Sequence, residues 1–362
     1  MKILLVARLF PDSFGDNIAV AARRLGHTVR VIEDSPILRH RSRYWAGFWA
    51  LVPKLVPEFE MRRHRALLRA AAEFDPDLIL LTETSLPPHI IRNLRRANRA
   101  KVAFWYPDAL VNLGRQYPLG CELDAWFFKD PYMVRMFRDK LGINAHYLPE
   151  ACNPLWHRPV ELTAEDIEKY GCDLTTASNM YYYRARMLEV FKDYDLKIWG
   201  KGYPPWLESP LRDKYTDVYV AKEAKAKAFG AAKIVLNTIH YGEIEGVNCR
   251  LFEVAGCGAF QIADRKPAMA ELFEPEYEVV TFQTRRELKE KVDYYLSRPE
   301  ERLRIAGRAR ARAHREHTYE LRLQRMFEIV GLAAKPELAA TRREDGGKPA
   351  GAVRRHPRPA AE

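Results

Sequence analysis

The sequence predicts an α/β fold made of two doubly wound halves, and three observations support this prediction. The chain has 362 residues, which is too long for one core and suits two domains of ordinary size. Short apolar runs alternate with amphipathic segments, which is typical of parallel sheets covered by helices. The alternation stops at the proline-rich segment 148–159 and then starts again.

Buried strands are expected in both halves, separated by helical or turn-rich segments. In the first half they are residues 2–6, 27–33, 77–83, 101–107, 124–129 and 145–149. In the second half they are residues 173–178, 196–200, 217–221, 233–238, 259–264 and 277–282. Residues 284–334 have a helical pattern, and the polar end of the chain, rich in proline and glycine, is expected to be disordered. The predicted units are residues 1–155, residues 156–316, a helix at 317–334 that returns to the first unit, and a tail at 335–362.

The composition favours an anionic partner and excludes some classes of site. The formal net charge is +11 and the sequence pI is near 9.3, which would attract nucleic acid, an acidic membrane surface or a phosphorylated small molecule, or simply aid solubility. The five cysteines are scattered without a C-x-x-C pair, which argues against disulfides and zinc and fits a reducing cytoplasm. No histidine cluster indicates a metal, and no run approaches the roughly 20 apolar residues that span a bilayer.

The segment EGVNCRLFEVAGCGAFQIAD, residues 245–264, follows the carboxyl end of a predicted strand. Ligands of open parallel sheets bind beyond these strand ends. We expect a helix with Asn248 as its N-cap and Gly258 just beyond its end, and the free amides at such a helix start attract phosphate. Glu253 offers two acceptor oxygens suited to a vicinal diol such as a ribose, and Glu245 can reach a second sugar. The alternative is that Glu253 is a solvated helix residue and Glu245 an ordinary loop acid.

The same segment resembles the E-x7-E segment of family 4 glycosyltransferases. The residues in register with that pattern are Glu245, Gly246, Glu253, Cys257, Gly258 and Ile262. Asn248 replaces a glycine of the pattern, and Phe260 and Gln261 replace Pro-Val. The N-x-R-x-F-E spacing is closer to the CgeB-like, spore-maturation-type branch, and the resemblance covers roughly residues 145–330.

This resemblance implies the GT-B fold, in which two Rossmann-like domains face each other across a cleft. It implies an N-terminal domain that holds the acceptor and a C-terminal domain that holds a nucleotide-sugar donor, with no metal and no separate cofactor. The departing diphosphate would be stabilised by the helix start at Gly246, Asn248 and Arg250. Resemblance to family 4 favours retention of anomeric configuration.

Other positions acquire donor-binding roles from the same resemblance. Arg184 or Arg186 would neutralise the donor diphosphate, as an arginine or lysine does in the resembled enzymes; the alternative is a solvated helix face. Gly200 and Gly202 would let the backbone approach the nucleotide base. Asn237 ends a predicted strand and faces the same crevice.

The first half carries the candidate catalytic acids in loops at the carboxyl ends of its strands. Asp108 is the first choice for the group that orients or deprotonates the acceptor hydroxyl, and Glu83 is the second. Either can instead be a helix N-cap. Gly15 lies where GT-B enzymes place a glycine-rich turn near the donor phosphates.

Residues 39–65 combine an apolar, aromatic centre with basic clusters at both ends. This composition suits a segment lying in a membrane interface, and packing on the first domain beside the acceptor is the alternative.

The sequence therefore predicts a cytoplasmic, metal-independent glycosyltransferase with a nucleotide-sugar donor, an unidentified acceptor and peripheral contact with an anionic membrane as one possible partner. An epimerase or hydrolase on the same fold and a non-catalytic anion-binding or membrane-binding protein remain alternatives. Nothing in the sequence resembles a nucleic-acid motif.

Overall fold

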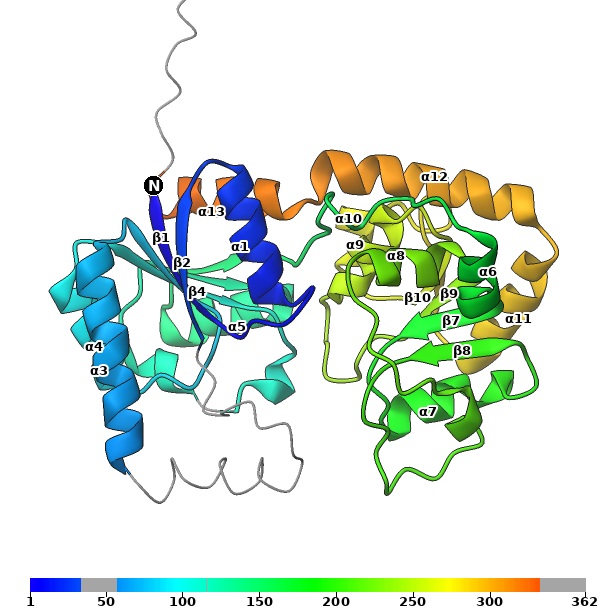
Figure 1. Cartoon of the computed structure of the whole chain (residues 1–362), viewed down its shortest axis with the longest axis horizontal. Coiled ribbons are helices and arrows are strands. Elements are labelled where there is room, and N and C mark those ends of the chain that lie inside the picture. The colour runs from blue at the N-terminus through cyan, green and yellow to red at the C-terminus, as the bar shows by residue number, and fades with distance from the viewer. Residues whose placement is uncertain (34–56, 115, 333–362) are drawn as a thin grey trace, which may run out of the picture. The chain divides into compact units, whose positions relative to one another are not determined.

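The computed structural model describes residues 1–33, 57–114 and 116–332, which contain two parallel β-sheets (Figure 1). Residues 39–56 of the basic and aromatic segment and the predicted tail at 335–362 lie outside the described residues. Among the helices that are described, none combines the length and the apolar composition needed to cross a membrane.

The N-terminal sheet has the strand order β2-β1-β3-β4-β5-β6, with every neighbouring pair parallel. Its strands are β1 (Lys2–Ala7), β2 (Thr28–Glu33), β3 (Leu78–Leu81), β4 (Lys101–Tyr106), β5 (Ala125–Phe128) and β6 (Ala145–Tyr147). The helices of this part are α1 (Phe14–Arg24), α3 (Pro57–Phe74), α4 (Pro88–Ala97), α5 (Pro131–Leu141) and the 3-10 turns η1 (Leu110–Asn112) and η2 (Tyr117–Gly120). The central strands are apolar at almost every position because helices cover both faces of the sheet.

Alternate residues of β1 show this double burial. Leu4 and Val6 pack with residues of α3, α4 and α5, whereas Ile3 and Leu5 pack with residues of α1 on the opposite face. The last described helix, α13 (Tyr319–Ile329), joins α1 on that second face.

The C-terminal sheet has the order β11-β10-β9-β7-β8, also parallel throughout. Its strands are β7 (Cys172–Ala177), β8 (Leu196–Trp199), β9 (Ala232–Asn237), β10 (Gln261–Asp264) and β11 (Val280–Phe282). Its helices are α6 (Ala164–Tyr170), α7 (Tyr182–Leu188), α8 (Glu223–Gly230), α9 (Cys249–Gly256), α10 (Met269–Leu272), α11 (Arg285–Leu296) and α12 (Pro299–Glu316), with the 3-10 turns η3 (Glu189–Phe191) and η4 (Arg212–Lys214). Residues of α7 and α11 pack on one face of the sheet, residues of α8 and α9 pack on the other, and α12 contributes residues to both sets of contacts.

The chain passes between the two sheets at two places that lie beside each other. Cys152 and Thr318 form an isolated parallel bridge, in which the Cys152 amide donates to the His317 carbonyl and the Tyr319 amide donates to the Cys152 carbonyl. Residues around Cys152 leave the N-terminal sheet, and residues around Thr318 bring α13 back to it (Figure 1).

The predicted strand at 217–221 is wrong. The described chain there has no strand, although Tyr215 makes one isolated bridge to Ile198. Asp217 takes a left-handed backbone conformation with φ 55°, and the side chain of Tyr219 turns outward to donate to the Pro11 carbonyl. In this segment Tyr219 thus contacts the N-terminal loop, and Val220 packs with Tyr170, Trp199 and Ala228, without any sheet pairing.

Candidate functional site

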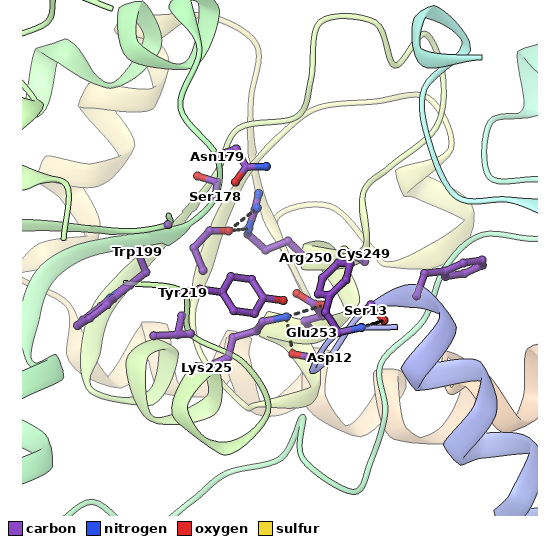
Figure 2. Close-up of a pocket in the computed structure, with 15 residues that line it drawn as sticks. Asp12, Ser13, Ser178, Asn179, Trp199, Tyr219, Lys225, Cys249, Arg250 and Glu253 are labelled. Carbon is purple, nitrogen blue, oxygen red and sulfur yellow. Dashed lines mark hydrogen bonds and ion pairs between the residues drawn. The ribbon is translucent and has the colours of Figure 1, made fainter. Parts of the chain in front are cut away.

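A pocket of about 250 Å³ lies between the carboxyl ends of β7 and β8, the first turns of α9 and the loop after β1 (Figure 2). Its lining combines aromatic and apolar side chains with a few charged groups. The lining residues are Phe10, Asp12, Ser13, Phe14, Ala177, Ser178, Asn179, Trp199, Gly200, Tyr219, Val220, Lys225, Cys249, Arg250 and Glu253. The position agrees with the rule that open parallel sheets bind ligands beyond their carboxyl edge.

Helix α9 begins at the pocket with a side-chain cap, as predicted. Asn248 accepts from the Leu251 amide at 3.2 Å and donates from Nδ2 to Oδ1 of Asn237 at 2.8 Å. Asn237 is buried at the end of β9, so its amide fixes the direction in which α9 leaves the sheet. Gly258 follows the helix with φ 69°, a conformation that favours glycine.

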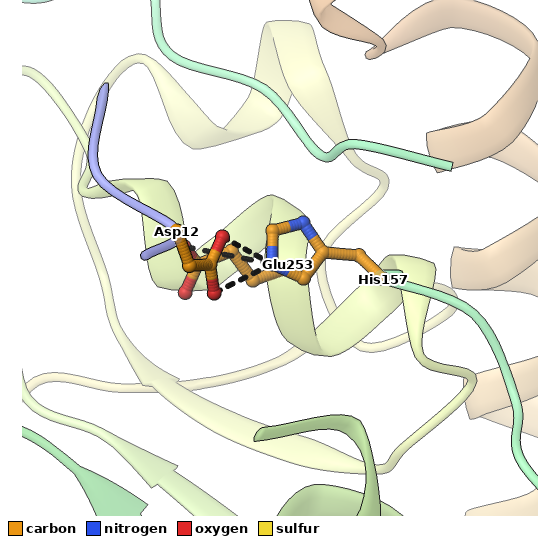
Figure 3. Close-up of side chains that lie close together, drawn as sticks. All are labelled: Asp12, His157 and Glu253. Atoms are coloured by element: carbon orange, nitrogen blue, oxygen red, sulfur yellow. Dashed lines mark hydrogen bonds and ion pairs between the residues drawn. The ribbon is translucent and has the colours of Figure 1, made fainter. Parts of the chain in front are cut away.

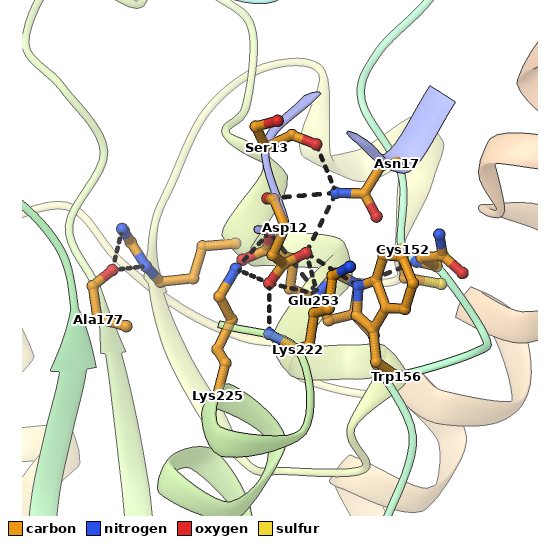
Figure 4. Close-up of polar contacts among 12 residues, drawn as sticks. Asp12, Ser13, Asn17, Cys152, Trp156, Ala177, Lys222, Lys225 and Glu253 are labelled. Atoms are coloured by element: carbon orange, nitrogen blue, oxygen red, sulfur yellow. Dashed lines mark hydrogen bonds and ion pairs between the residues drawn. The ribbon is translucent and has the colours of Figure 1, made fainter. Parts of the chain in front are cut away.

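Arg250 is the arginine that lies in the pocket. Its Nε donates to the Ala177 carbonyl at 2.9 Å, which holds the guanidinium across the end of β7 (Figures 2 and 4). The side chain is only partly buried. A charged, multidentate donor at the start of α9 adds to the positive end of the helix dipole, which suits binding of phosphate.

Glu253 lies one turn further along α9 and its carboxylate is paired inside the protein. Lys225 of α8 places its Nζ 3.0 Å from Glu253 Oε1, and the two side chains are 9% and 7% exposed. The same ammonium lies 2.6 Å from Oδ2 of Asp12, in the loop after β1. The Asp12 cluster is defined as Asp12, His157, Lys225 and Glu253.

Asp12 is the anionic centre of this cluster. Burial alone would raise the pKa of its carboxyl, but the Lys225 ammonium and a hydrogen bond from His157 hold the pKa well below its usual value. Burial likewise opposes the charge of Lys225, yet the carboxylates of Glu253 and Asp12 raise its pKa above the usual value. Both groups are therefore charged at neutral pH.

Three oxygen and nitrogen atoms of the Asp12 cluster lie close enough to suggest a metal site. One ligand atom each from Asp12, His157 and Glu253 lies within 4.8 Å of the others (Figure 3). The carboxylates of Asp12 and Glu253 already share the Lys225 ammonium, however. A bound cation would lie beside that positive charge. These residues therefore do not fit a resident divalent metal well.

The two other arginines predicted to bind the diphosphate lie outside the pocket lining. Arg184 is buried and donates to the carbonyls of Asn179 and Thr238 and, at 2.9 Å, to the Thr238 hydroxyl. Burial lowers its pKa to about 10. Arg186 is exposed and pairs with Glu189 at 2.9 Å. Arg184 thus joins the loop after β7 to the end of β9, and Arg186 faces solvent.

The predicted glycines have varied surroundings, and only Gly200 lines the pocket. A Cβ at Gly200 would lie 2.6 Å from the Ser178 carbonyl, so this glycine permits close packing of the loops after β7 and β8. Gly15 packs α1 against Ala7, and Gly202 lies in a turn beyond β8. Gly246 lies against the backbone of Lys129 and Asp130, where a Cβ would be 2.7 Å from the Lys129 carbonyl oxygen.

None of the three acids predicted to be catalytic lines the pocket. Asp108 is exposed and accepts from the Ala109 amide and the Asn112 side chain. Glu83 lies 3.2 Å from Arg8. Glu245 forms a two-pronged pair with Arg135 of α5, with one N–O distance of 2.9 Å. Their catalytic roles remain predictions.

A second buried charge cluster lies where the loop after β9 contacts the N-terminal sheet. Lys129, at the end of β5, has its Nζ 2.6 Å from Glu243 and 3.6 Å from Glu150. These residues are the Lys129 cluster. Next to it, Asp130 caps α5 and also accepts from the amides of Ile244 and Glu245. The loop between β9 and α9 is therefore held by the N-terminal sheet.

Sequence reasoning missed the residues that surround the Glu253 carboxylate, which are Asp12, Lys225 and His157. Asp12 lies in a loop that the strand-end rule does identify, but the resemblance to a glycine-rich turn points to Gly15 of that loop instead. Lys225 lies in a lysine-rich helix whose composition does not distinguish it from solvated neighbours. Only the tertiary fold brings it to Glu253.

Comparisons with known proteins agree with the architecture. Residues 184–328 match the family model described as glycosyl transferase-like. The spore protein CgeB of Bacillus subtilis (strain 168) is 24% identical over 190 residues, which cover 48% of this chain and 57% of that protein. The chain thus aligns with little more than half of that relative.

Solved structures resemble the chain over most of its length. Sucrose-phosphate synthase from Thermosynechococcus elongatus has a TM-score of 0.67 and 14% identity, covering 91% of this chain and 98% of that one. A glycosyltransferase from Rickettsia africae ESF-5 has a TM-score of 0.64 and 15% identity, and the match covers 91% of this chain and 97% of that one. HepE of Anabaena, solved with UDP and glucose, has a TM-score of 0.62 and 12% identity, and the match covers 91% of this chain and 99% of that one.

At these identities the solved structures establish the fold, which is GT-B, and so confirm the predicted fold class. The glycosyl transferase-like match covers the part of the chain that carries β9, α9 and most of the pocket's C-terminal side. The resemblance seen in residues 245–262 lies inside that match. Together these findings show a glycosyl transferase-like segment, residues 184–328, in a chain with the GT-B fold.

Proposed function

We propose that the chain transfers a sugar from a nucleoside diphosphate donor to an acceptor hydroxyl, with the donor bound in the pocket at the start of α9. The observation that carries this proposal is the combination of Glu253, Arg250 and the α9 N-terminus on one pocket. The carboxylate suits a ribose diol, and the guanidinium and the helix start suit a diphosphate. HepE of Anabaena has been solved with UDP-glucose, which supports a donor of this class.

The chemistry assigned to these groups is electrostatic. As the bond from the anomeric carbon to the diphosphate oxygen breaks, negative charge grows on the leaving group. Arg250 and the amides at the start of α9 stabilise that charge without moving, because both are held by neighbouring backbone and side chains. Retention of configuration is part of this proposal and rests on the family resemblance.

A nucleotide screen tests the donor site. UDP, GDP and ADP should be titrated against the folded protein, and a nucleotide at about a hundred times its dissociation constant should stabilise the fold by about 2.7 kcal/mol. Glu253→Ala should weaken binding of that nucleotide by roughly ten- to a hundredfold, because a hydrogen bond to a charged group contributes about 1.5 to 3 kcal/mol. A well-folded variant with unchanged affinity would refute the assignment of Glu253.

Turnover separates the proposed reaction from its alternatives. A transferase should release nucleoside diphosphate from the matching nucleotide-sugar much faster when an acceptor is added, whereas an epimerase or hydrolase needs no acceptor. We also propose that the reaction needs no metal, because the Lys225 ammonium already neutralises the carboxylates nearest the pocket. Loss of turnover in EDTA with recovery in Mg²⁺ or Mn²⁺ would overturn that part.

A further inference from the structure

The ammonium of Lys225 links two carboxylates from different parts of the fold. Asp12 belongs to the loop after β1 of the N-terminal sheet, whereas Glu253 and Lys225 belong to α9 and α8 of the C-terminal part. Figure 2 shows the lysine reaching between both acids at the edge of the pocket. Among the described contacts of Glu253, the closest cation is this one, and Nε2 of His157 lies 3.9 Å from Oε1 of Glu253.

Asp12 is held so firmly that it can serve as a fixed reference for the lysine. Its carboxylate accepts from the Trp156 indole at 2.9 Å, the Asn17 side-chain amide at 3.1 Å and the Lys222 backbone amide at 3.1 Å (Figure 4). The residue also adopts φ 62°, an unusual value for an aspartate, and its own amide donates to Asp16. Strain of this kind persists only where surrounding contacts impose it.

His157 completes the fixed side of the cluster. Its Nδ1 accepts from the Asn153 amide at 2.9 Å, so in the neutral ring the proton is on Nε2. That nitrogen lies 3.3 Å from Oδ2 of Asp12 and donates to it (Figure 3). The histidine therefore stabilises and orients the carboxylate that holds Lys225, without itself lining the pocket.

Without the lysine, the two acids would repel each other. Oxygen atoms of Asp12 and Glu253 lie within 4.8 Å, both side chains are buried, and like charges at this range disfavour each other strongly. The Glu253 carboxylate would then be pushed from its present position. Its two oxygens would no longer be presented to a diol in the pocket.

We propose that Lys225 and Asp12 are positioning residues that hold the Glu253 carboxylate in the place where it recognises the ribose of the donor. This inference rests on the proposed function, and it adds that a residue of the N-terminal sheet takes part in recognising a ligand bound by the C-terminal sheet. The consequence is specific: loss of Lys225 should remove the preference for a ribose over a deoxyribose, rather than weaken all nucleotides equally.

The experiment measures that preference by calorimetry, as the ratio of dissociation constants for a 2′-deoxynucleoside diphosphate and its ribonucleoside counterpart. The probes are UDP, GDP and ADP with their 2′-deoxy forms, and the pair that binds most tightly is used. Wild type should prefer the ribonucleotide by roughly tenfold or more, on the strength of one hydrogen bond to a charged acceptor. Lys225→Met should bring the ratio close to one, with little change in affinity for the deoxy form.

Two further variants show whether the effect comes from the charge or from packing. Lys225→Arg keeps a cation and should restore most of the preference. Lys227→Met is the matched control, because Lys227 lies on the same helix but pairs with Asp166 and Glu223, and it should behave as wild type. If Lys225→Met does not fold, Asp12→Asn removes the other charge that orients the lysine and should also lower the ratio.

The outcomes distinguish this inference from the proposed function. If wild type binds none of the probes, the proposed function fails and this inference fails with it. If wild type shows the preference and Glu253→Ala loses it while Lys225→Met retains it, only the role of Lys225 is overturned. An equal loss of affinity for both members of the pair in Lys225→Met would show a purely structural role and would also overturn it.

Discussion

At the scale of single residues, three arginines with similar sequence signals have different surroundings. Arg184 satisfies backbone carbonyls in the interior, Arg186 faces solvent, and Arg250 lies in the pocket. Periodicity and charge alone could not separate these arginines. Where each side chain lies depends on how α7 and α9 meet the ends of β7 and β9. The spacing to Glu245 and the family resemblance predict a role for Glu253, whereas Lys225 comes to this place only through the tertiary fold.

Replacement of Arg250 by alanine tests its role with a built-in comparison. The affinity for the nucleoside diphosphate that binds wild type should fall by roughly ten- to a hundredfold, since charge-assisted hydrogen bonds contribute about 1.5 to 3 kcal/mol. The affinity for the corresponding nucleoside, which lacks phosphates, should change much less. Arg186→Ala is the control and should leave both affinities unchanged; an equal loss for nucleoside and diphosphate in Arg250→Ala would contradict a phosphate contact.

At the scale of elements, the sequence predicted most strands and the helix α9 with its cap, because local patterns specify them. Runs such as KILLV are apolar at every position only if both faces are buried, and Asn248 is a preferred N-cap residue. The false strand at 217–221 had the right pattern, but the pairing with β8 stops after the single bridge at Tyr215, where Asp217 takes a left-handed conformation. Which loop meets which strand end, as in the Lys129 cluster, depends on contacts distant in sequence and could not be predicted.

The Lys129 cluster should make stability depend on pH. Burial, countered in part by Lys129, raises the pKa of Glu150 from its usual 4.5 to about 7. Glu243, Glu253 and Asp108 also act on Glu150, and each raises this pKa further. At a pH between 4.5 and about 7, Glu150 holds a proton in the folded chain that it has lost in the unfolded chain. The contribution of Glu150 to stability is therefore greatest below pH 4.5 and declines as the pH rises to about 7.

Glu150→Gln removes this titration and provides the test. From pH 5 to pH 8, the free energy of unfolding of wild type should fall relative to that of the variant by on the order of 1 to 3 kcal/mol. Urea unfolding at several pH values measures the difference. Glu161→Gln changes an exposed carboxylate elsewhere and should track wild type; parallel pH profiles for wild type and Glu150→Gln would contradict the assignment.

At the scale of the whole molecule, the excess positive charge and the segment 39–65 suggest a membrane partner. Residues 39–56 lie outside the described residues, so this prediction rests on their composition. If the segment is an interfacial anchor, the protein should sediment with vesicles containing anionic lipid, and binding should weaken with salt. Replacing Trp45 and Trp49 by serine should then reduce sedimentation.

The alternative, that this segment contacts the acceptor, gives the opposite pattern. The double variant would then lose acceptor use while its sedimentation with vesicles stays as in wild type. If wild type does not sediment at low salt, the anchor is excluded and a water-soluble acceptor becomes the better hypothesis.

The return of α13 to the N-terminal sheet affects the order in which the protein can fold during synthesis. Tyr319, Leu323 and Met326 are buried together with Ile3, Leu5 and Trp105, so the first sheet to leave the ribosome lacks part of its core. That apolar face stays uncovered until the last described helix is made, although N-terminal domains usually fold first. Chains released early, before residue 319, should therefore be prone to aggregation, and the N-terminal part can be produced alone only if α13 is supplied with it.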